Sequence, residues 1–104
     1  MSYQSALLAL GDPTRRRILE ELRDGPLAVG RIADRLPVSR PAVSRHLRVL
    51  ESAALVRHEE LGTRRLYEVD LDGVAALREW LESWWDEPLR RYAAHVEEMN
   101  DVDE

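Results

Sequence analysis

The sequence of 104 residues contains no cysteine. This absence excludes disulfide bonds, thiolate metal sites and cysteine nucleophiles, and it agrees with a reducing cytoplasm. The chain also lacks an apolar run near the roughly 20 residues that a membrane-spanning helix needs. Its first residues, MSYQSALLALGDP, have neither the basic start nor the cleavage region of a signal peptide. We therefore expect a cytoplasmic protein.

The residue patterns of common enzymes are also missing. The five glycines are scattered and form no phosphate-binding loop, and there is no Gly-x-Ser-x-Gly nucleophile elbow. The carboxylate pairs are adjacent in sequence, and neighbours at i, i+1 on a helix diverge, so they make poor acid–base dyads. No repeat or linker divides the chain. We expect a single domain over residues 1–104 that is not an enzyme and needs no cofactor.

Lysine is absent as well, so all fifteen basic residues are arginine. The formal net charge is −5, but its distribution is uneven. Residues 31–67 hold eight arginines and four acidic residues, whereas residues 68–104 hold three arginines and twelve acidic residues. A basic middle beside an acidic end indicates a phosphate-facing surface that is separate from the rest of the molecule.

Two helices are expected before residue 23. The first covers residues 3–10, with Leu7, Leu8 and Leu10 on its apolar side. The second starts with Asp12 as N-cap and Pro13 at the first helical position, and its inward residues are Ile18, Leu19 and Leu22.

Residues 29–53 have the pattern of a helix-turn-helix. A short helix over residues 29–36 is followed by a turn at Pro37, and a second helix covers residues 39–53. Ser39 can cap this second helix, and Val43, Leu47 and Leu50 recur at i, i+4, i+7 as its buried stripe. The segment PVSRPAVSRHLRVL carries three arginines and no acidic residue, which leaves a basic face free for a partner.

Residues 55–69 are expected to form a β-hairpin that turns at Gly62. A hairpin with arginines near its tip, placed directly after a recognition helix, is typical of the wing in a winged helix. The last segment, residues 72–99, has an amphipathic helical pattern whose phase slips by one residue near Pro88. We expect a kink or a restart there, capped by Asp86. The predicted fold is mainly α with a β-hairpin wing, in the order α-α-α-α-β-β-α.

The segments LGDPTRRRILEEL, RIADRLPVSRPAVSRHLRVLESAALV and GTRRLYEVD, taken in order, resemble the ArsR/SmtB family of bacterial winged-helix repressors. The C-terminal LREWLESWWDEPLRRY is similar to a branch of small autorepressor-like members that lack the cysteine metal site. The resemblance implies a homodimer joined by its first and last helices, residues 1–10 and 72–99. It also implies a transcriptional repressor whose two winged motifs bind a palindromic operator in double-stranded DNA.

Where the family's metal sensors carry a Cys-x-Cys pair, this chain has Ala28 and Gly30. The last helix offers only His95 and Glu98 at i, i+3, with Asp86 nine residues before His95. We therefore expect no metal site. A metal- or ligand-gated sensor of the same fold stays an alternative, as does a winged helix used for protein–protein contact through its acidic last third. The sequence does not identify a small-molecule effector.

The expected DNA-binding residues lie on the recognition helix, residues 39–53, and on the wing. Arginine both neutralises phosphates and reads guanine edges, so the roles divide. We assign base readout to Arg40, Ser44 and Arg45, and phosphate contact to Ser39, Arg48, Arg64 and Arg65. An operator of inverted repeats with half-site centres about 34–36 Å apart would match a dimer. The full set is Ser39, Arg40, Pro41, Ser44, Arg45, Arg48, Thr63, Arg64 and Arg65.

The expected dimer-interface residues are Tyr3, Leu7, Trp80, Trp84 and Trp85. A chain of this length has little core in which to hide three indoles, and interfaces favour large aromatic anchors. Burial within one subunit and a tryptophan-lined ligand pocket are the alternatives.

Two histidines and a run of three arginines are also expected to have defined positions. His46 is expected to be satisfied by a neighbouring helix, with a base contact as the alternative, and His58 is expected to lie on the plain surface. The run from Arg15 to Arg17 at a helix start suggests either a phosphate contact or a salt bridge to the acidic tail.

Overall fold

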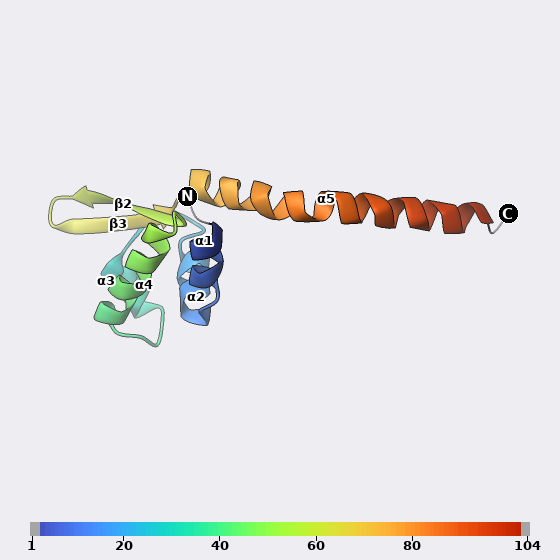
Figure 1. Cartoon of the computed structure of the whole chain (residues 1–104). Coiled ribbons are helices and arrows are strands. Elements are labelled where there is room, and N and C mark those ends of the chain that lie inside the picture. The colour runs from blue at the N-terminus through green and yellow to red at the C-terminus, as the bar shows by residue number, and fades with distance from the viewer. Residues whose placement is uncertain (1–2, 103–104) are drawn as a thin grey trace.

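The computed structural model describes residues 3–102 as five helices and three strands (Figure 1). The order confirms the predicted winged helix-turn-helix, with one strand added. The molecule measures 68 × 27 × 22 Å because its last helix projects far beyond the body. The elements are α1 (Tyr3–Leu10), α2 (Pro13–Glu21), β1 (Leu27–Ala28), α3 (Val29–Asp34), α4 (Arg40–Ser52), β2 (Val56–Leu61), β3 (Arg64–Val69) and α5 (Leu71–Val102).

Side-chain caps fix where three of the helices begin. Asp12 Oδ1 accepts hydrogen bonds from the backbone N–H groups of Thr14 at 2.8 Å and Arg15 at 3.1 Å, as predicted for the start of α2. Ser39 Oγ accepts from the N–H of Ala42 at 3.3 Å and starts α4. Asp70, which the sequence analysis did not single out, caps α5 by accepting from the N–H of Gly73 at 3.0 Å. Each cap satisfies a donor that the helix itself leaves unpaired.

The sheet is antiparallel, and its strand order is β1-β3-β2. The predicted hairpin is present, with Gly62 at φ +63° in its turn and His58 opposite Tyr67. Strand β1 was not predicted. It is two residues long, too short to show a period of two, and it exists only because Leu27 pairs with Tyr67 across the sheet.

The core lies where α1, α2, α3 and α4 meet the base of the wing. The predicted stripe of α4 is confirmed, since Val43, Leu47 and Leu50 are all fully buried. The predicted apolar side of α1 is confirmed only at Leu10, which packs against the core. Ala6 and Ala9 are buried, whereas Leu7 is 43% and Leu8 is 68% exposed. Alanine lets a short helix approach its neighbours closely, so Leu7 and Leu8 are left outside.

The expected restart of the last helix is also wrong, while the alternative, a kink at Pro88, stays a prediction. Helix α5 runs without interruption from Leu71 to Val102 with Pro88 inside it, and Asp86 caps nothing (Figure 1). Proline removes one hydrogen bond and disfavours a helix interior by about 3 kcal/mol. Pro88 lies on an exposed stretch, where water can hydrogen-bond the carbonyl that loses its partner.

Helix α5 has two parts with different surroundings. Leu77 is buried, and Val74, Trp80 and Leu81 pack against the core. Beyond Leu81 the helix leaves the body, and its apolar side chains are mostly exposed: Trp84, Trp85, Leu89, Tyr92 and Met99 are 52–67% exposed. Over residues 3–102, no helix combines the length and the apolar character needed to cross a membrane.

Candidate nucleic-acid interface

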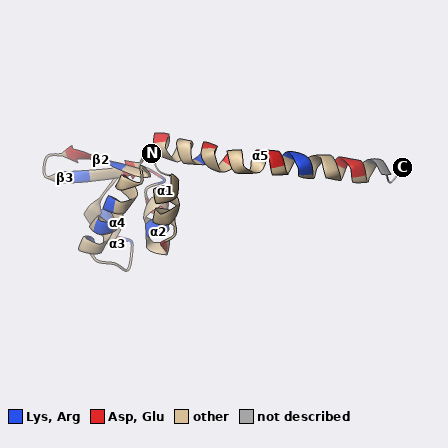
Figure 2. Cartoon of the chain, in the orientation of Figure 1, with Lys and Arg blue, Asp and Glu red and all other residues tan. Residues whose placement is uncertain are grey.

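The outer face of α4 presents its arginines to solvent. Arg40, Arg45 and Arg48 are exposed, and Ser44 is half-buried. Figure 2 shows basic residues on α4 and on strand β3 of the wing, and acidic residues on strand β2 and along much of α5. The stripe of Val43, Leu47 and Leu50 holds the helix against the core, so the orientation of the arginines follows from the burial of the stripe.

A basic hollow of about 540 Å³ lies between the starts of α3 and α4 and the tip of the wing. It brings together one arginine of α3, one of α4 and two of β3 with a single carboxylate, that of Asp34. Arg31 is a member that the sequence analysis missed. The hollow is lined by Ala28, Val29, Gly30, Arg31, Asp34, Arg40, Thr63, Arg64 and Arg65.

Gly30 and Arg40 are in close contact within this hollow. A Cβ built on Gly30 would lie 2.8 Å from Arg40 Nη2 and 2.9 Å from Cζ. The guanidinium therefore rests directly over the first turn of α3, in space that any larger residue at position 30 would take.

The wing carries exposed Thr63, Arg64 and Arg65 at and after its turn. Arg65 Nε lies 3.3 Å from Glu60 Oε1 on the opposite strand, which offsets part of its charge. Nearer the base, Arg57 Nε donates to Glu68 Oε1 at 2.7 Å. Among the described residues, Arg64 is thus the wing arginine that forms no ion pair with a carboxylate.

His58 is not plain surface, contrary to the prediction. Its Nδ1 lies 2.9 Å from Oε1 and 2.5 Å from Oε2 of Glu51, in the last turn of α4. Its ring also lies against Tyr67, with centroids 5.2 Å apart. These contacts join the wing to the recognition helix. The sequence spacing could not reveal them because Glu51 and His58 belong to different elements.

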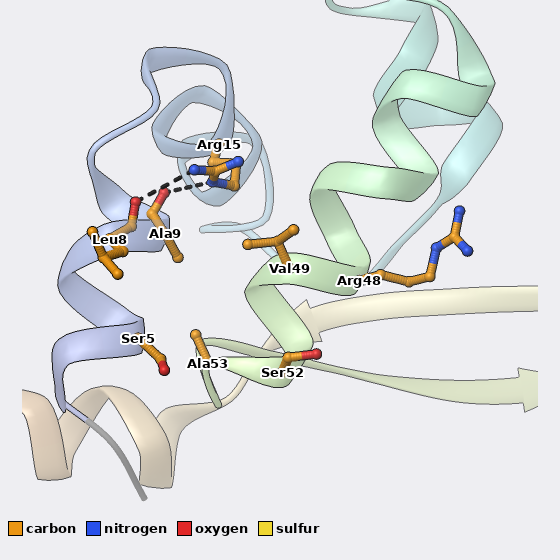
Figure 3. A pocket seen from close by; sticks show the side chains of 8 residues that line it. All are labelled: Ser5, Leu8, Ala9, Arg15, Arg48, Val49, Ser52 and Ala53. Carbon is orange, nitrogen blue, oxygen red and sulfur yellow. Dashed lines mark hydrogen bonds between the residues drawn. The ribbon is translucent and has the colours of Figure 1, made fainter.

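Two of the three arginines at the start of α2 bind the carboxyl end of α1. Arg15 Nε donates to the carbonyl of Ala9 at 2.6 Å and Nη2 to that of Leu8 at 3.3 Å (Figure 3). Arg16 Nη1 donates to the carbonyl of Leu10 at 2.7 Å. These bonds hold the carboxyl end of α1, where the Leu8 carbonyl also accepts from the N–H of Gly11 at 3.1 Å. Among the described residues no carboxylate pairs with Arg15 or Arg16, so the salt bridge, one of the two expected alternatives, is not found for them.

His46 lies at the other side of Arg15. Its Nδ1 is 3.4 Å from Arg15 Nη1, so a residue of the neighbouring helix α2 provides its polar partner, in agreement with the sequence analysis. Because Arg15 contacts both the carbonyl of Ala9 and the ring of His46, it links the end of α1 to the recognition helix α4.

The expected dimer residues fall into two groups. Tyr3 stacks on Trp80, with centroids 4.9 Å apart and planes at 5°, and Trp80 meets the edge of Trp84 at 5.2 Å. Tyr3 and Trp80 are thus partly buried within one chain. Leu7, Trp84 and Trp85 are 43%, 59% and 52% exposed and remain available to a partner.

The residues considered as metal ligands in the sequence lie in two separate parts of the molecule. Ala28 and Gly30 line the basic hollow and offer no ligand side chain. His95 and Asp86 are exposed on the projecting part of α5. Within residues 3–102, no group of three histidine, aspartate or glutamate side chains is arranged to hold an ion. That the protein works without a metal stays a prediction.

Comparison with known sequences and structures gives consistent matches. A family model described as a helix-turn-helix domain matches residues 10–59. The HTH-type transcriptional regulator Rv2034 of Mycobacterium tuberculosis is 53% identical over 96% of this chain and 94% of its own length. The transcriptional repressor SdpR of Bacillus subtilis is 36% identical over 60% of this chain and 69% of its own length.

Two solved structures resemble the fold at similar coverage. An ArsR-like transcriptional regulator from Rhodococcus sp. RHA1 has a TM-score of 0.77 and 35% identity, over 88% of this chain and 87% of that one. The homodimeric winged helix-turn-helix DNA-binding domain Mb0332 from Mycobacterium bovis has a TM-score of 0.66 and 31% identity, over 81% of this chain and 78% of that one.

Proposed function

Because this chain belongs to the ArsR/SmtB family of winged-helix transcriptional regulators, we propose that it is a homodimeric repressor that binds double-stranded DNA in the cytoplasm. One observation carries the proposal. The exposed arginines of α4 and of the wing gather on one part of a chain whose net charge is −5. A protein that neutralises phosphates needs such a local excess of positive charge, whatever its total.

Position around α4 supports Arg45 as the main base reader. With 3.6 residues per turn, Arg45 lies about 200° around the helix from Val43, almost opposite the buried stripe. A side chain placed there points away from the core and into a major groove that receives the helix. Ser44, about 100° from Val43, borders the same face. Ser39, Pro41, Arg48, Thr63, Arg64 and Arg65 flank it and are suited to positioning contacts with the sugar–phosphate backbone.

Binding to fragments of the protein's own promoter, followed by fluorescence anisotropy, tests the proposal. We expect specific binding to an inverted repeat with half-site centres about 34–36 Å apart, or a multiple of one turn. In the variant Arg45→Ala, the difference in binding free energy between operator and random DNA should shrink by about 1–3 kcal/mol. Arg23→Ala, which removes an exposed arginine in the turn after α2, is the matched control and should bind as the parent does. Equal affinity of the parent for operator and random DNA would contradict a sequence-specific repressor.

The proposed dimer rests on the apolar surface that one chain leaves uncovered. Trp84, Trp85, Leu89 and Tyr92 project into solvent on α5, and a lone helix does not retain such residues without a partner. Near α1, a hollow of about 400 Å³ is lined by the apolar side chains of Leu8, Ala9 and Val49 and also by Arg15 and Arg48 (Figure 3). A second copy that joins through α1 and α5 would cover the apolar side chains of both surfaces.

Sedimentation equilibrium at micromolar concentration measures this association. We expect a dimer for the parent and a shift toward monomer for Trp85→Ala, which removes an exposed indole that makes no described ring contact within the chain. Leu61→Ala, an equally exposed apolar residue on the wing, is the control and should stay dimeric. A folded parent monomer at that concentration would refute the proposed interface.

A further inference from the structure

Arg40 occupies a different side of the recognition helix from Arg45. Taking Val43 as the origin, Arg40 lies about 60° around the axis, next to the buried stripe, whereas Arg45 lies about 200° around it. The structure agrees with this placement, since the Arg40 guanidinium rests over Gly30 of α3. A side chain held there faces the junction of α3 and the wing and leaves the outward face of α4 to Arg45.

The surroundings of the Arg40 guanidinium are strongly cationic. Arg31, Arg64 and Arg65 line the same hollow, and Asp34 supplies its one lining carboxylate. Glu60 offsets part of the charge on Arg65 but does not line the hollow. Guanidinium groups gathered in this way repel one another, and an anion among them lowers their energy. Their planar donors match the oxygens of a phosphate group.

We propose that this hollow receives a backbone phosphate of the bound duplex, and that Arg40 is a phosphate-positioning residue and not a base reader. Arg31 and Arg64 complete the phosphate site from α3 and from the wing. The proposal rests on the DNA-binding function proposed above and assigns one element of it. It replaces the sequence-based assignment of Arg40 to base readout and leaves Ser44 and Arg45 as readers.

Contacts to phosphate and to bases differ in how they respond to salt and to sequence. Loss of one phosphate contact weakens binding to all DNA alike and lowers the slope of log K against log salt by about 0.9. Loss of a base contact instead reduces the ratio of operator to random affinity, by about fivefold to 150-fold for a good bidentate pair. Salt-titrated anisotropy on operator and random duplexes of equal length separates the two.

We expect Arg40→Ala and Arg31→Ala each to lower the salt slope by about one unit while the ratio of operator to random affinity stays at the parent value. Arg40→Lys keeps the charge and should restore the slope. Arg45→Ala serves as the base-reading comparison and should reduce the ratio. A reduced ratio in Arg40→Ala, or an unchanged slope, would overturn the phosphate assignment even while the parent binds its operator. A parent that binds no DNA would instead overturn the proposed function itself.

Gly30 gives a second test that leaves every charge in place. A methyl group at position 30 would lie 2.8 Å from Arg40 Nη2, so Gly30→Ala must displace the guanidinium. Alanine has a higher helix propensity than glycine, so loss of folding is not expected. Binding to both duplexes should weaken severalfold, whereas in the Arg40→Ala background the same change should have no further effect. If Gly30→Ala weakened DNA binding equally in the parent and in the Arg40→Ala variant, the contact between Gly30 and Arg40 would be contradicted.

Discussion

Gly73, in the first turn of α5, provides the sharpest test of how the helix is joined to the DNA-binding body. The residue is buried against Ala54, in the turn that connects α4 to β2. A Cβ at position 73 would overlap the carbonyl oxygen of Ala54 and lie 2.9 Å from its carbonyl carbon. Carbon atoms prefer a separation of at least about 3.5 Å, so the carbon alone requires a shift of about 0.6 Å and the oxygen requires more.

Neither side of this contact can move freely. Ala54 has φ +60°, a conformation that already costs a non-glycine residue about 1–2 kcal/mol. Its N–H donates to the carbonyl of Glu51 at 3.0 Å, and the N–H of Asp70 donates to the carbonyl of Leu55 at 3.0 Å. A shift that relieves Gly73→Ala must therefore strain these bonds or move the start of α5.

We expect Gly73→Ala to lower the free energy of unfolding by at least about 2 kcal/mol. Overpacking costs about 1–3 kcal/mol for added methylenes, and an overlap with backbone atoms belongs at or above the upper limit of this range. The higher helix propensity of alanine returns about 1 kcal/mol, which leaves a loss of at least about 2 kcal/mol. For a domain of this size, 2 kcal/mol corresponds to a fall in Tm of about 8–16 °C. Circular dichroism melts at one fixed protein concentration measure it, since dimerisation makes Tm depend on concentration.

Gly62→Ala is the matched control. Gly62 also has a positive φ, +63°, but a Cβ there would meet nothing within 4 Å. Its substitution carries only the conformational cost, about 1–2 kcal/mol. If Gly73→Ala melts with the parent, or above Gly62→Ala, the close approach of α5 to the Ala54 turn is refuted.

Two further predictions concern single contacts. Backbone hydrogen bonds from Arg15 and Thr14 hold the pKa of Asp12 below its usual range, so the stability that the ionised carboxylate adds is complete above about pH 4 and is lost as the pH falls further. The variant Asp12→Asn keeps an acceptor oxygen but cannot ionise, so melts from pH 6 to 3 should lack this pH-dependent loss of stability. A pH profile equal to that of the parent would contradict the cap. His58→Ala removes the contact of the wing with Glu51 of α4, so the free energy of unfolding should fall by about 1 kcal/mol or less and hydrogen exchange of the backbone amides along β2 should become faster. Unchanged amide exchange would exclude a role for the Glu51 contact.

The features that the sequence predicted correctly depend on residues close to one another in the chain. Asp12 and Ser39 cap helices because their acceptors reach N–H groups two or three residues ahead. The stripe of Val43, Leu47 and Leu50 follows from helical periodicity alone. Such local rules were enough to give the helix-turn-helix, the wing and the set of exposed arginines.

The errors arise where distant segments decide the outcome. Strand β1 requires β3 as a partner, and the buried face of α1 is set by how closely it approaches its neighbours, which selected Ala6 and Ala9 over Leu7. The position of Arg40 depends on the absence of a side chain at Gly30, ten residues earlier and on another helix. No periodicity in the sequence encodes such a contact.

The arrangement of charge along the molecule has a consequence for how DNA is captured. Arginine surfaces lie at the wing end, and the acidic α5 extends toward the other end, which gives each copy a large electric dipole moment (Figure 2). In a dimer with α5 at its two-fold axis, dipole components perpendicular to the axis cancel and only the axial component survives. A duplex that approaches along this axis meets two attractive ends, whereas one that approaches α5 is repelled. Encounters are therefore oriented before contact, and their rate should fall steeply as ionic strength rises.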